Sequence, residues 1–538
     1  MAKPHILILG GGFVATEAVK RLRGSIRRGD VDVTVVTRHN YHELHGLIGE
    51  MVTGRLGVEQ ILTPVRRVFS PARIHVGEID SIDLDARRVT VSRHLDGAEH
   101  TLTYDHLVVC VGTTDNLAMY PGLAEHGFRL KAFDDCFRVK NHILTMFELA
   151  DIEEDPAERR RLLTFFVAGG GFAGCEVAGE LCDFARLLTA REYKRLRAEE
   201  CRVVLVQPGP HILPELHTGK GAAGYGTGHP RLVDYATKHI KDLGTEIVLD
   251  CGVSWVSATE VGLSDGRRIP TRTVISAVGT RAQPIVEALP LAKDSHGRIV
   301  VDCCMRVPGR ENVWAAGDCA AVPHPDGGPC PPSALWASKE GGHLGRNLVR
   351  LLIEKAEPTA FPFRGFGQVV SIGRRTAVGD VKGIELKGKL PWFAWRVILM
   401  SFVPTWDRRI KLVSDWLVWP LVGRDVVEMS VTDANRYDIS KEFFEAGEVV
   451  VAQGQVCPFM YVIVEGEAES ARQSTNGTRD VGQLKQGDHF GRRARGGVAQ
   501  ETIVAKTDLR TVSVRVQHGQ GLDILRSIGR AVETEAVP

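Results

Sequence analysis

The stretch "HILILGGGFVATEAVKRL", residues 5–22, decides the fold class of this chain. An apolar run typical of a buried parallel strand leads into three glycines, and the residues after them have the periodicity of a helix. A second apolar run, "VDVTVV" at residues 31–36, follows the helical segment. This order of strand, glycine turn, helix and strand predicts a dinucleotide-binding unit of an α/β protein.

The small residues of the turn "GGGFVA", residues 10–15, each have a physical role in such a unit. Gly10 permits the tight turn and Gly12 lets the backbone approach a pyrophosphate, while Ala15 lets the helix pack on the strand. Phe13 begins the helix, whose positive N-terminal end would face the phosphates. The alternative is a tight strand–helix turn that binds no ligand.

The acidic residue that usually binds a ribose at the end of the second strand is absent. Thr37 stands at that position and Arg38 follows it. A threonine hydroxyl can hydrogen-bond to a ribose hydroxyl, although more weakly than a carboxylate. We therefore include both residues among the expected cofactor contacts.

The same device recurs as "GGGFAG" after the apolar run "LLTFFVA" and before a second helical segment. Gly169, Gly171 and Gly174 take the three glycine positions, and Phe172 begins the helix. Gln207 takes the acid position at the end of the next strand. An amide does not repel the 2′-phosphate of NADPH, so the choice between NADH and NADPH stays open.

Three further apolar runs end in glycine. "YDHLVVCVG" ends at Gly112 and "TVISAVG" ends at Gly279, each about 100 residues after its own glycine turn. "NVWAAGDCA" places Gly317 and Asp318 after another buried strand. We expect two dinucleotide-binding domains, one holding its dinucleotide tightly and one exchanging it.

Composition limits the other classes of function. With 538 residues the chain is long enough for several domains, and a net charge of +1 gives no general attraction to nucleic acid. None of the 11 cysteines forms a C-x-x-C pair, which is typical of reduced thiols in a cytoplasmic protein. No metal site is expected, because the third histidine of His39, His42 and His45 turns away from the first two on a helix.

These signals in this order resemble the flavoproteins that have two dinucleotide-binding domains, of the pyridine nucleotide-disulfide oxidoreductase-like superfamily. Within them the chain is similar to type II NADH dehydrogenases (NADH:quinone oxidoreductases) over about residues 5–425. Four segments carry that resemblance: "RHNYHELHGLIGEMVTGRL" (38–56), "PGLAEHGFRLKAFDDCFRVKNHIL" (121–144), "HILPEL" (211–216) and "IGRRTAV" (372–378). The resemblance implies an FAD enzyme that passes hydride from NAD(P)H to the flavin and electrons to a quinone without pumping protons.

The resemblance also implies roles for single residues. Asp318 would contact the phosphate and ribityl side of the flavin, and Gln207 would help to hold the nicotinamide dinucleotide. Glu176 would lie near the nicotinamide and the flavin as the catalytic residue; the alternative is a carboxylate that only offsets the helix dipole. The expected cofactor contacts are Gly10, Gly12, Phe13, Ala15, Thr37, Arg38, Gly112, Gly317, Asp318, Ala334, Gly169, Gly171, Phe172, Gly174, Gln207 and Gly279.

The acceptor side departs from the family pattern A-Q-x-x-x-Q. Ala334 is present, but Leu335 and Lys339 replace the two glutamines, and Phe366 replaces a lysine. Trp336 and Phe366 would either stack on a flat acceptor or fill the site. Two alternatives therefore stay open: a flavin reductase or oxidase with a non-quinone acceptor, and a redox or nucleotide sensor.

Residues 391–422 hold five of the eight tryptophans, together with the cationic group Arg408, Arg409 and Lys411. Neither apolar stretch here is long enough to span a bilayer, and tryptophan with basic residues is typical of helices that lie on a membrane surface. We expect peripheral attachment to the inner face of the membrane. A homodimer interface or a core helix pair is the alternative.

After about residue 435 short β runs alternate with glycine turns and resemble a cyclic-nucleotide-binding jelly roll. Arg492 replaces the glutamate that binds the cyclic phosphate, and Gln500 and Glu501 lie where an arginine belongs, so a structural or regulatory barrel is favoured. The expected fold is α/β, with the NAD domain inserted in the FAD domain and an all-β domain appended. Its expected divisions are 1–125 with 285–350 (FAD), 160–284 (NAD(P)H), 351–430 (strands and membrane helices) and 435–525 (barrel).

Overall fold

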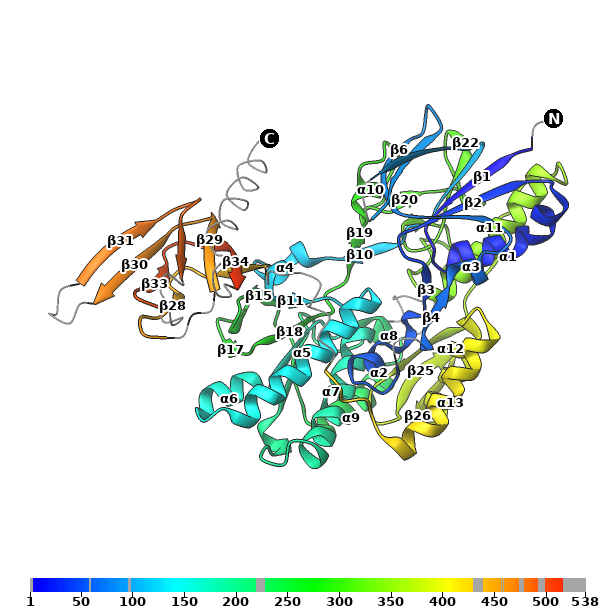
Figure 1. Ribbon diagram of the computed structural model, residues 1–538. Coiled ribbons are helices and arrows are strands. Elements are labelled where there is room, and N and C mark those ends of the chain that lie inside the picture. Colours follow the sequence, from blue (N-terminus) through cyan, green and yellow to red (C-terminus); the bar gives the residue numbers. More distant parts are fainter. Residues whose placement is uncertain are drawn as a thin grey trace.

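The computed structural model describes residues 3–57, 60–94, 98–218, 228–428, 439–455, 457, 459–473, 479–491 and 499–515. Two α/β units lie next to each other, and a smaller β domain extends from the second unit at one end of the molecule (Figure 1). Arg492, which takes the place of the glutamate of the cyclic-nucleotide motif, lies outside the described residues.

The first α/β unit is built on a six-stranded sheet. β1 (His5–Leu9) pairs in parallel with both β2 (Asp32–Thr37) and β9 (His106–Val109), as the buried apolar runs predict. Helix α1 (Phe13–Arg28) follows β1, and it packs against α11 (Ala334–Leu352) from the far end of the unit. The strand order is β21 (Arg306–Val307), β22 (Arg310–Ala315), β9 (His106–Val109), β1 (His5–Leu9), β2 (Asp32–Thr37) and β5 (Arg73–Val76).

The second unit lies, in sequence, between β9 and β22 of the first. Its five-stranded parallel sheet has the order β11 (Gly127–Phe128), β18 (Thr273–Ser276), β12 (Thr164–Ala168), β13 (Arg202–Val206) and β14 (Thr245–Val248). The helices of this unit are α5 (Phe133–Ile152), α6 (Pro156–Leu162), α7 (Phe172–Arg191), α8 (Pro214–Thr218) and α9 (Pro230–Asp242). Since both units repeat strand, glycine turn and helix, the α/β dinucleotide-binding fold occurs twice.

A two-stranded antiparallel ribbon joins the two units. β10 (Thr113–Asp115) begins directly after Gly112, and β19 (Thr280–Ala282) begins directly after Gly279. The two strands pair with each other, Thr113 opposite Ala282. The two strand–glycine endings of the sequence therefore meet where the chain passes between the units.

Three small antiparallel sheets cover the edges of the units. They are β6 (Glu78–Asp83) with β7 (Arg88–Ser92) and β8 (Glu99–Thr103); β15 (Val253–Val256) with β16 (Glu260–Leu263) and β17 (Arg268–Pro270); and β24 (Gly367–Ser371) with β25 (Ala377–Val381) and β26 (Ile384–Gly388). Shorter elements are β3 (Tyr41–Glu43), β4 (Leu62–Pro64), α2 (Ile48–Val52), α3 (Val65–Val68), α4 (Leu123–His126), α10 (Pro284–Glu287), β20 (Ile299–Val300) and β23 (Ala320–Ala321).

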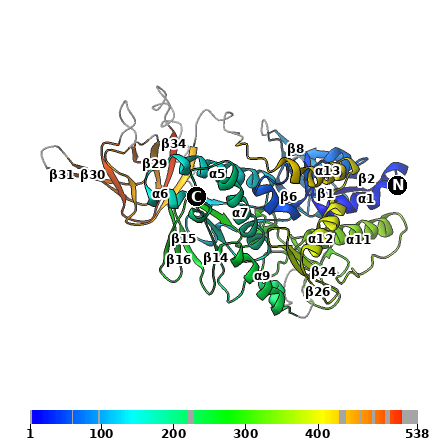
Figure 2. The same ribbon diagram turned by 90° about the horizontal axis from the view of Figure 1, so that it is seen from below.

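Two tryptophan-rich helices follow the third of these sheets. α12 (Lys389–Phe402) packs on β24, β25 and β26, and α13 (Trp406–Val422) follows it on the outside of the molecule (Figure 2). Among the described residues, no helix combines the length and the apolar character needed to cross a membrane.

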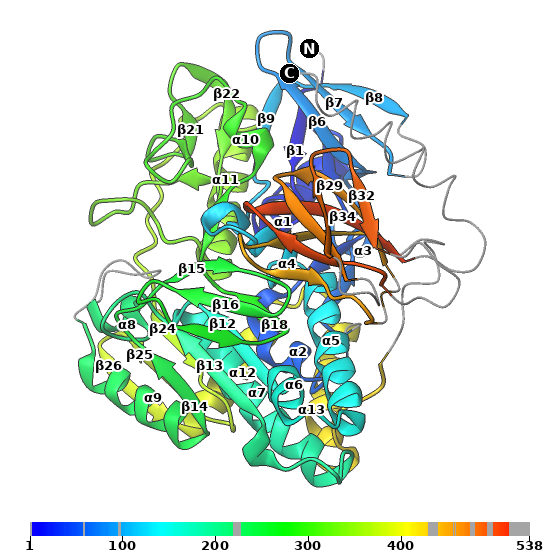
Figure 3. The same cartoon turned by 90° about the vertical axis from the view of Figure 1, so that its left-hand side faces the viewer.

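The C-terminal β domain has two four-stranded antiparallel sheets. One has the order β27 (Ile439–Phe444), β34 (Leu509–Arg515), β29 (Phe459–Glu465), β32 (His489–Gly491); the other β28 (Val449–Val451), β33 (Thr502–Ala505), β30 (Ala468–Gln473), β31 (Arg479–Leu484). This domain lies over α4 and β15 in the end-on view (Figure 3). Arg510 and Glu125 form an ion pair across the contact at 3.0 Å, and Arg268 and Glu445 another at 3.1 Å.

Candidate functional site

The first glycine turn has no space for larger residues on its protein side and open space on its outer side. Gly10 has a φ of +121°, and a Cβ there would lie 2.3 Å from the carbonyl oxygen of Cys110 on the neighbouring chain segment. A Cβ on Gly12 would meet no atom within 4 Å. The turn therefore leaves room beside Gly12 for a ligand to approach the backbone.

The helices that follow the two turns begin alike. Gly12 and Gly171 are the N-cap residues of α1 and α7, and neither helix has a side-chain cap or an acidic residue in its first turn. Side-chain oxygens normally satisfy the free N–H groups at a helix start. Here those N–H groups and the positive helix ends remain available to an anion such as a pyrophosphate.

The second turn is tighter than the first. A Cβ on Gly174 would lie 1.8 Å from the carbonyl oxygen of Gly169, so only glycine fits there. Gln207, at the end of β13, accepts a hydrogen bond from the backbone N–H of Gly170 at 2.8 Å through its Oε1. The amide that replaces the usual acid thus also holds the turn in place, while Phe172 begins α7.

Residues expected near the first dinucleotide already have partners in the protein. The Thr37 hydroxyl donates to the carbonyl of His39 at 3.1 Å, and Arg38 forms a bidentate ion pair with Glu78 at 2.7 and 2.6 Å. His42, which the sequence pattern did not single out for this role, contacts the carbonyl of Gly11 through Nδ1 at 3.1 Å and packs edge-on against Phe13. The buried His42 ring therefore stabilises the glycine turn through these two contacts.

The Gly317–Asp318 turn is held by a buried carboxyl group. Glu340 of α11 accepts a hydrogen bond from the backbone N–H of Gly317 at 2.7 Å. Burial raises the pKa of Glu340 to about 7, against the lowering effect of that hydrogen bond. Asp318 lies 3.3 Å from the Nζ of Lys131, which comes from the second unit. This turn therefore brings side chains of both units together, and Ala334 begins the helix that carries Glu340.

Glu176 and Glu17, which follow the two turns at equal spacing, have different surroundings. Glu17 forms an ordinary surface pair with Lys20 at 3.2 Å. Glu176 lies in the second turn of α7 against α2, where a Cβ on Gly49 would be 2.9 Å from its Cγ. Burial raises the pKa of Glu176 well above its usual value, and the charges of Glu50 and Glu180 raise it further.

Glu176 belongs to a group of seven charged residues between α2, α7 and the C-terminal helices, which we call the carboxylate–arginine cluster. Arg55 pairs with Glu180 at 3.1 Å and with Asp183 at 2.8 Å. The members are Glu50, Glu176, Glu180, Asp183, Arg55, Arg396 and Arg424. Four carboxyl groups therefore face three guanidinium groups, and burial raises the pKa of Glu176 and of Glu180 within this cluster.

Aromatic rings surround the positions at which the sequence departs from the family pattern. Trp336 of α11 is buried and packs edge-on against Phe363 at 4.9 Å between ring centroids. Phe366 is 46% exposed, and the Nζ of Lys339 lies 5.5 Å from its ring centroid. Trp336 therefore fills the interior, while Phe366 and Lys339 present a flat ring and a charge at the surface.

More than half of the chain matches one known protein family. Residues 4–341 match the family described as pyridine nucleotide-disulphide oxidoreductase. The chain belongs to this family. Residues 366–425 match the NDH2 C-terminal domain, and residues 441–522 match the cyclic nucleotide-binding domain.

Relatives of this oxidoreductase share most of its length. "Type II NADH:quinone oxidoreductase NdhA" of Mycobacterium tuberculosis is 28% identical over 445 residues, which cover 80% of this chain and 90% of that protein. "Internal alternative NAD(P)H-ubiquinone oxidoreductase A1, mitochondrial" of Arabidopsis thaliana is 27% identical over 459 residues, 79% of this chain and 85% of that protein. The fold also matches the structure of NDH2 from Plasmodium falciparum in complex with NADH, with a TM-score of 0.71 at 17% identity over 79% of this chain and 100% of that one.

The cysteines of this oxidoreductase are free thiols in the described part of the chain. Cys175, next to Glu176, is buried and directs its thiol to the carbonyl of Gly170 at 3.3 Å. Burial raises the pKa of the Cys175 thiol and keeps it protonated. The thiol closest to the second turn therefore has a structural role.

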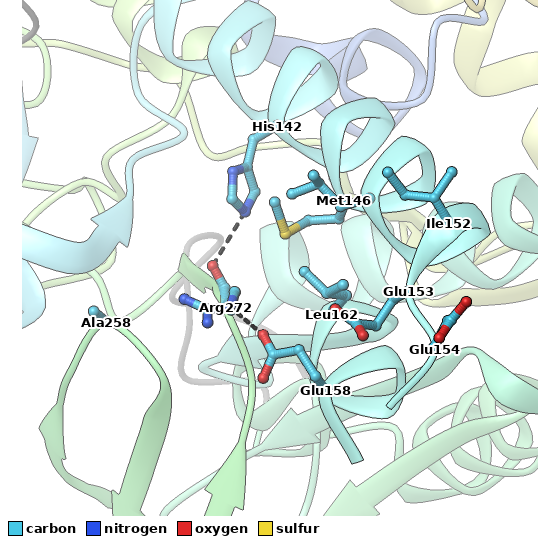
Figure 4. A pocket seen from close by; sticks show the side chains of 10 residues that line it. His142, Met146, Ile152, Glu153, Glu154, Glu158, Leu162, Ala258 and Arg272 are labelled. Atoms are coloured by element: carbon cyan, nitrogen blue, oxygen red, sulfur yellow. Dashed lines mark hydrogen bonds and ion pairs between the residues drawn. The ribbon is translucent and has the colours of Figure 1, made fainter. Parts of the chain in front are cut away.

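A cavity of about 690 Å³ opens on the outer side of the second unit, between α5, α6 and the residues around Arg272 (Figure 4). His142 points to the carbonyl oxygen of Arg272, 3.1 Å from its Nε2, and the guanidinium of Arg272 pairs with Glu158 at 2.6 Å. The residues lining it include none of the cofactor contacts expected from the sequence. It is separate from the two glycine turns.

The described residues contain no group of three histidine, cysteine or acidic side chains placed to hold a metal ion. His39 stacks on Tyr41, and His45 lies 3.3 Å from Glu43. The long-range partners Glu340, Lys131 and Arg396 had no signal in the sequence, because each meets its partner only through the fold.

Proposed function

We propose that this protein is an FAD-dependent NAD(P)H dehydrogenase that passes electrons to a quinone without pumping protons. The net reaction is NAD(P)H plus quinone plus one proton giving NAD(P)⁺ and quinol. Bound FAD would supply a ring that can accept hydride and give up two electrons. The task of the chain is to hold two dinucleotides so that their reactive rings meet.

The observation that carries this proposal is the pair of glycine turns whose helices lack acidic residues and side-chain caps. The ribbon of β10 and β19 and the Lys131–Asp318 contact join the units that carry these turns. Family membership over residues 4–341 also supports the proposed dehydrogenase function. Relatives with named NADH:quinone or NAD(P)H-ubiquinone activity cover four fifths of the chain.

The proposed contacts divide between the two units. In the first unit FAD would lie on Gly10, Gly12, Phe13, Ala15, Thr37, Arg38, Gly112, Gly317, Asp318 and Ala334. In the second unit NAD(P)H would lie on Gly169, Gly171, Phe172, Gly174, Gln207 and Gly279. The open space at Gly12 and the turn-holding hydrogen bond of Gln207 support these assignments.

We assign Glu176 as the catalytic side chain, in its neutral form. It follows the second turn on α7, and the carboxylate–arginine cluster around it favours one retained proton. A neutral carboxyl at this position donates a hydrogen bond, or a proton during the reaction, where a carboxylate cannot.

A membrane surface is the proposed site of action, on the inner face. Both tryptophan-rich helices leave apolar side chains uncovered, with Leu390 and Phe393 of α12 80% and 63% exposed and Trp406 of α13 73% exposed. Arg409 lies beside Trp406, 4.8 Å from its ring centroid. Apolar faces bordered by aromatic and cationic groups favour the membrane interface. The C-terminal β domain would then act as a regulatory module docked on the second unit.

Anaerobic reduction of the purified FAD-loaded protein tests the proposal. NADH or NADPH should bleach the flavin absorbance, and a short-chain quinone should restore it. No bleaching by either cofactor contradicts the dehydrogenase function. Bleaching followed by reoxidation with oxygen or ferricyanide, but not with quinone, would favour the alternative of a flavin reductase or oxidase, consistent with Leu335, Lys339 and Phe366.

A further inference from the structure

A second cavity, of about 330 Å³, lies at the C-terminal end of α7. It is lined by Asp183, Arg186, Leu187, Ala190, Arg191, Arg374 and Arg424. Because α7 has 20 residues, this cavity is about 25 Å from the glycine turn at the other end of the helix. Four arginines and one acid are therefore gathered at a place that dinucleotide binding does not use.

The arginines come from three separate parts of the chain. Arg186 and Arg191 belong to the last turns of α7, Arg374 to the turn between β24 and β25, and Arg424 to the segment after α13. The Nη1 of Arg191 lies 3.4 Å from the position that a Cβ on Gly423 would take, next to Arg424. The fold therefore places like charges close together, although their mutual repulsion disfavours the folded state.

The buried member of the group has unused hydrogen-bonding capacity. Arg424 is 8% exposed, and its Nη2 lies 2.7 Å from Asp183. Its Nε and Nη1 have no hydrogen-bond partner among the described residues. Buried donors of this kind usually have a partner, so the one N–H of Nε and the two of Nη1 are left for a ligand or water.

The positive charge exceeds what the surroundings compensate. Arg424 is balanced by Asp183 and Glu180, whereas Arg186, Arg191 and Arg374 form no ion pair with any described residue. The C-terminal ends of α7 and α13 contribute about half a negative charge each. A net positive charge of about two therefore remains at the cavity.

We propose that this cavity is an anion site for a phosphate group, taken either from free inorganic phosphate or from the headgroup of an anionic phospholipid. Guanidinium groups bind phosphate oxygens through paired hydrogen bonds, and three segments of the chain supply them to the cavity. A volume of about 330 Å³ is at the small end of ligand sites, which suits a phosphate or a compact headgroup. Arg191 and Arg374 are exposed, so the site opens to solvent.

The cavity is connected to the carboxylate–arginine cluster through one residue. Arg424 belongs both to this cavity and to the carboxylate–arginine cluster, through Asp183 and Glu180. An anion that binds Arg424 competes with those carboxylates and thereby shifts the charge balance around Glu176. The proposal rests on binding geometry alone and does not require the proposed dehydrogenase function.

Titration calorimetry on the full-length FAD-loaded protein tests the site without any nicotinamide cofactor. Sodium phosphate is compared with sodium chloride at equal ionic strength, for the wild type, Arg374→Gln and Arg191→Gln. Arg375→Gln is the matched control, because Arg375 has the same left-handed backbone as Arg374, φ 57° against 48°, and does not line the cavity. The expected result is phosphate affinity reduced about tenfold or more in both cavity variants and unchanged in the control.

The second arm uses vesicles of phosphatidylcholine with and without phosphatidylglycerol. Phosphatidylglycerol-dependent binding that is lost in Arg374→Gln and Arg191→Gln but kept in Arg375→Gln identifies the lipid headgroup as the source. Free phosphate binding with no such difference on vesicles identifies the free ion. The proposal is overturned if the cavity variants equal the control in both arms, including the case in which they only lower the melting temperature as helix-end charges would.

Discussion

Arg396 of α12 and Glu50 of α2 form a buried ion pair, although 346 residues separate them in the chain. Arg396 also lies between two tryptophans, 3.9 Å from the ring centroid of Trp392 and 4.8 Å from that of Trp416. One guanidinium therefore joins both tryptophan-rich helices to the helix pair that carries Glu176. The same arginine therefore contacts the proposed membrane-binding helices and the cluster that contains the proposed catalytic residue.

Replacing Arg396 with Met should destabilise the protein by about 3 kcal/mol or more, because Glu50 is left buried without its partner. Arg67→Met is the control: Arg67 joins α3 to Asp407 of α13 at 2.9 Å, but in an exposed pair that should contribute less than about 1 kcal/mol. Urea unfolding of the two variants measures the difference. Equal losses would contradict a structural role of the buried pair.

The sequence predicts the local parts of this molecule well and the long-range parts poorly. Glycine turns, buried strands and the helix starts at Phe13 and Phe172 depend on neighbours in sequence, so the sequence pattern predicts them. Glu340, Arg396 and Arg424 gain their roles from partners that only the fold supplies. Arg38 stays a predicted cofactor contact, and the fold adds an ion pair with Glu78 that the sequence pattern does not predict.

Gly12→Ala should leave the folded apoprotein stable and weaken FAD binding. Gly12 has a φ of −85°, which alanine adopts readily, and the added Cβ meets no protein atom within 4 Å. Gly10→Ala is the contrasting variant: its Cβ would meet the Cys110 carbonyl and its backbone is left-handed, so unfolding should become easier by at least about 2 kcal/mol. Flavin absorbance after purification and thermal unfolding of the apoprotein separate the two effects. Normal flavin content in Gly12→Ala would place the pyrophosphate elsewhere.

Glu340 should make the stability of the protein fall as pH rises. Its pKa of about 7 in the folded state exceeds the ordinary 4.5, so between these values the folded state keeps a proton that the unfolded chain has lost. The stability lost across this window is about 3 kcal/mol. Glu340→Gln retains an oxygen for the Gly317 N–H but cannot titrate, so its unfolding free energy should vary less with pH. Glu311→Gln, the same change at an exposed position of β22, should leave the pH dependence as in the wild type.

Gln207→Glu should shift cofactor preference toward NADH. The glutamate keeps an oxygen to accept the hydrogen bond from Gly170, so the turn is retained, while its charge repels a 2′-phosphate at the end of β13. The ratio of kcat/KM for NADPH to that for NADH should fall about tenfold, equivalent to 1.4 kcal/mol of added repulsion. Steady-state rates with both cofactors measure this. An equal decrease for both would show that Gln207 only supports the turn.

Phe393→Glu should weaken attachment to membranes while leaving turnover with a water-soluble quinone intact. Phe393 is 63% exposed on α12, and transfer of a phenylalanine side chain out of water is worth about 1.5–3 kcal/mol, so vesicle partitioning should weaken by about tenfold or more. Ile384→Glu is the control, because Ile384 is equally exposed at 64% but lies on β26, outside the two helices. Flotation with liposomes should separate the two variants. Retained binding of Phe393→Glu, or equal loss in both, would assign the exposed apolar helices to another partner such as a second copy of the chain.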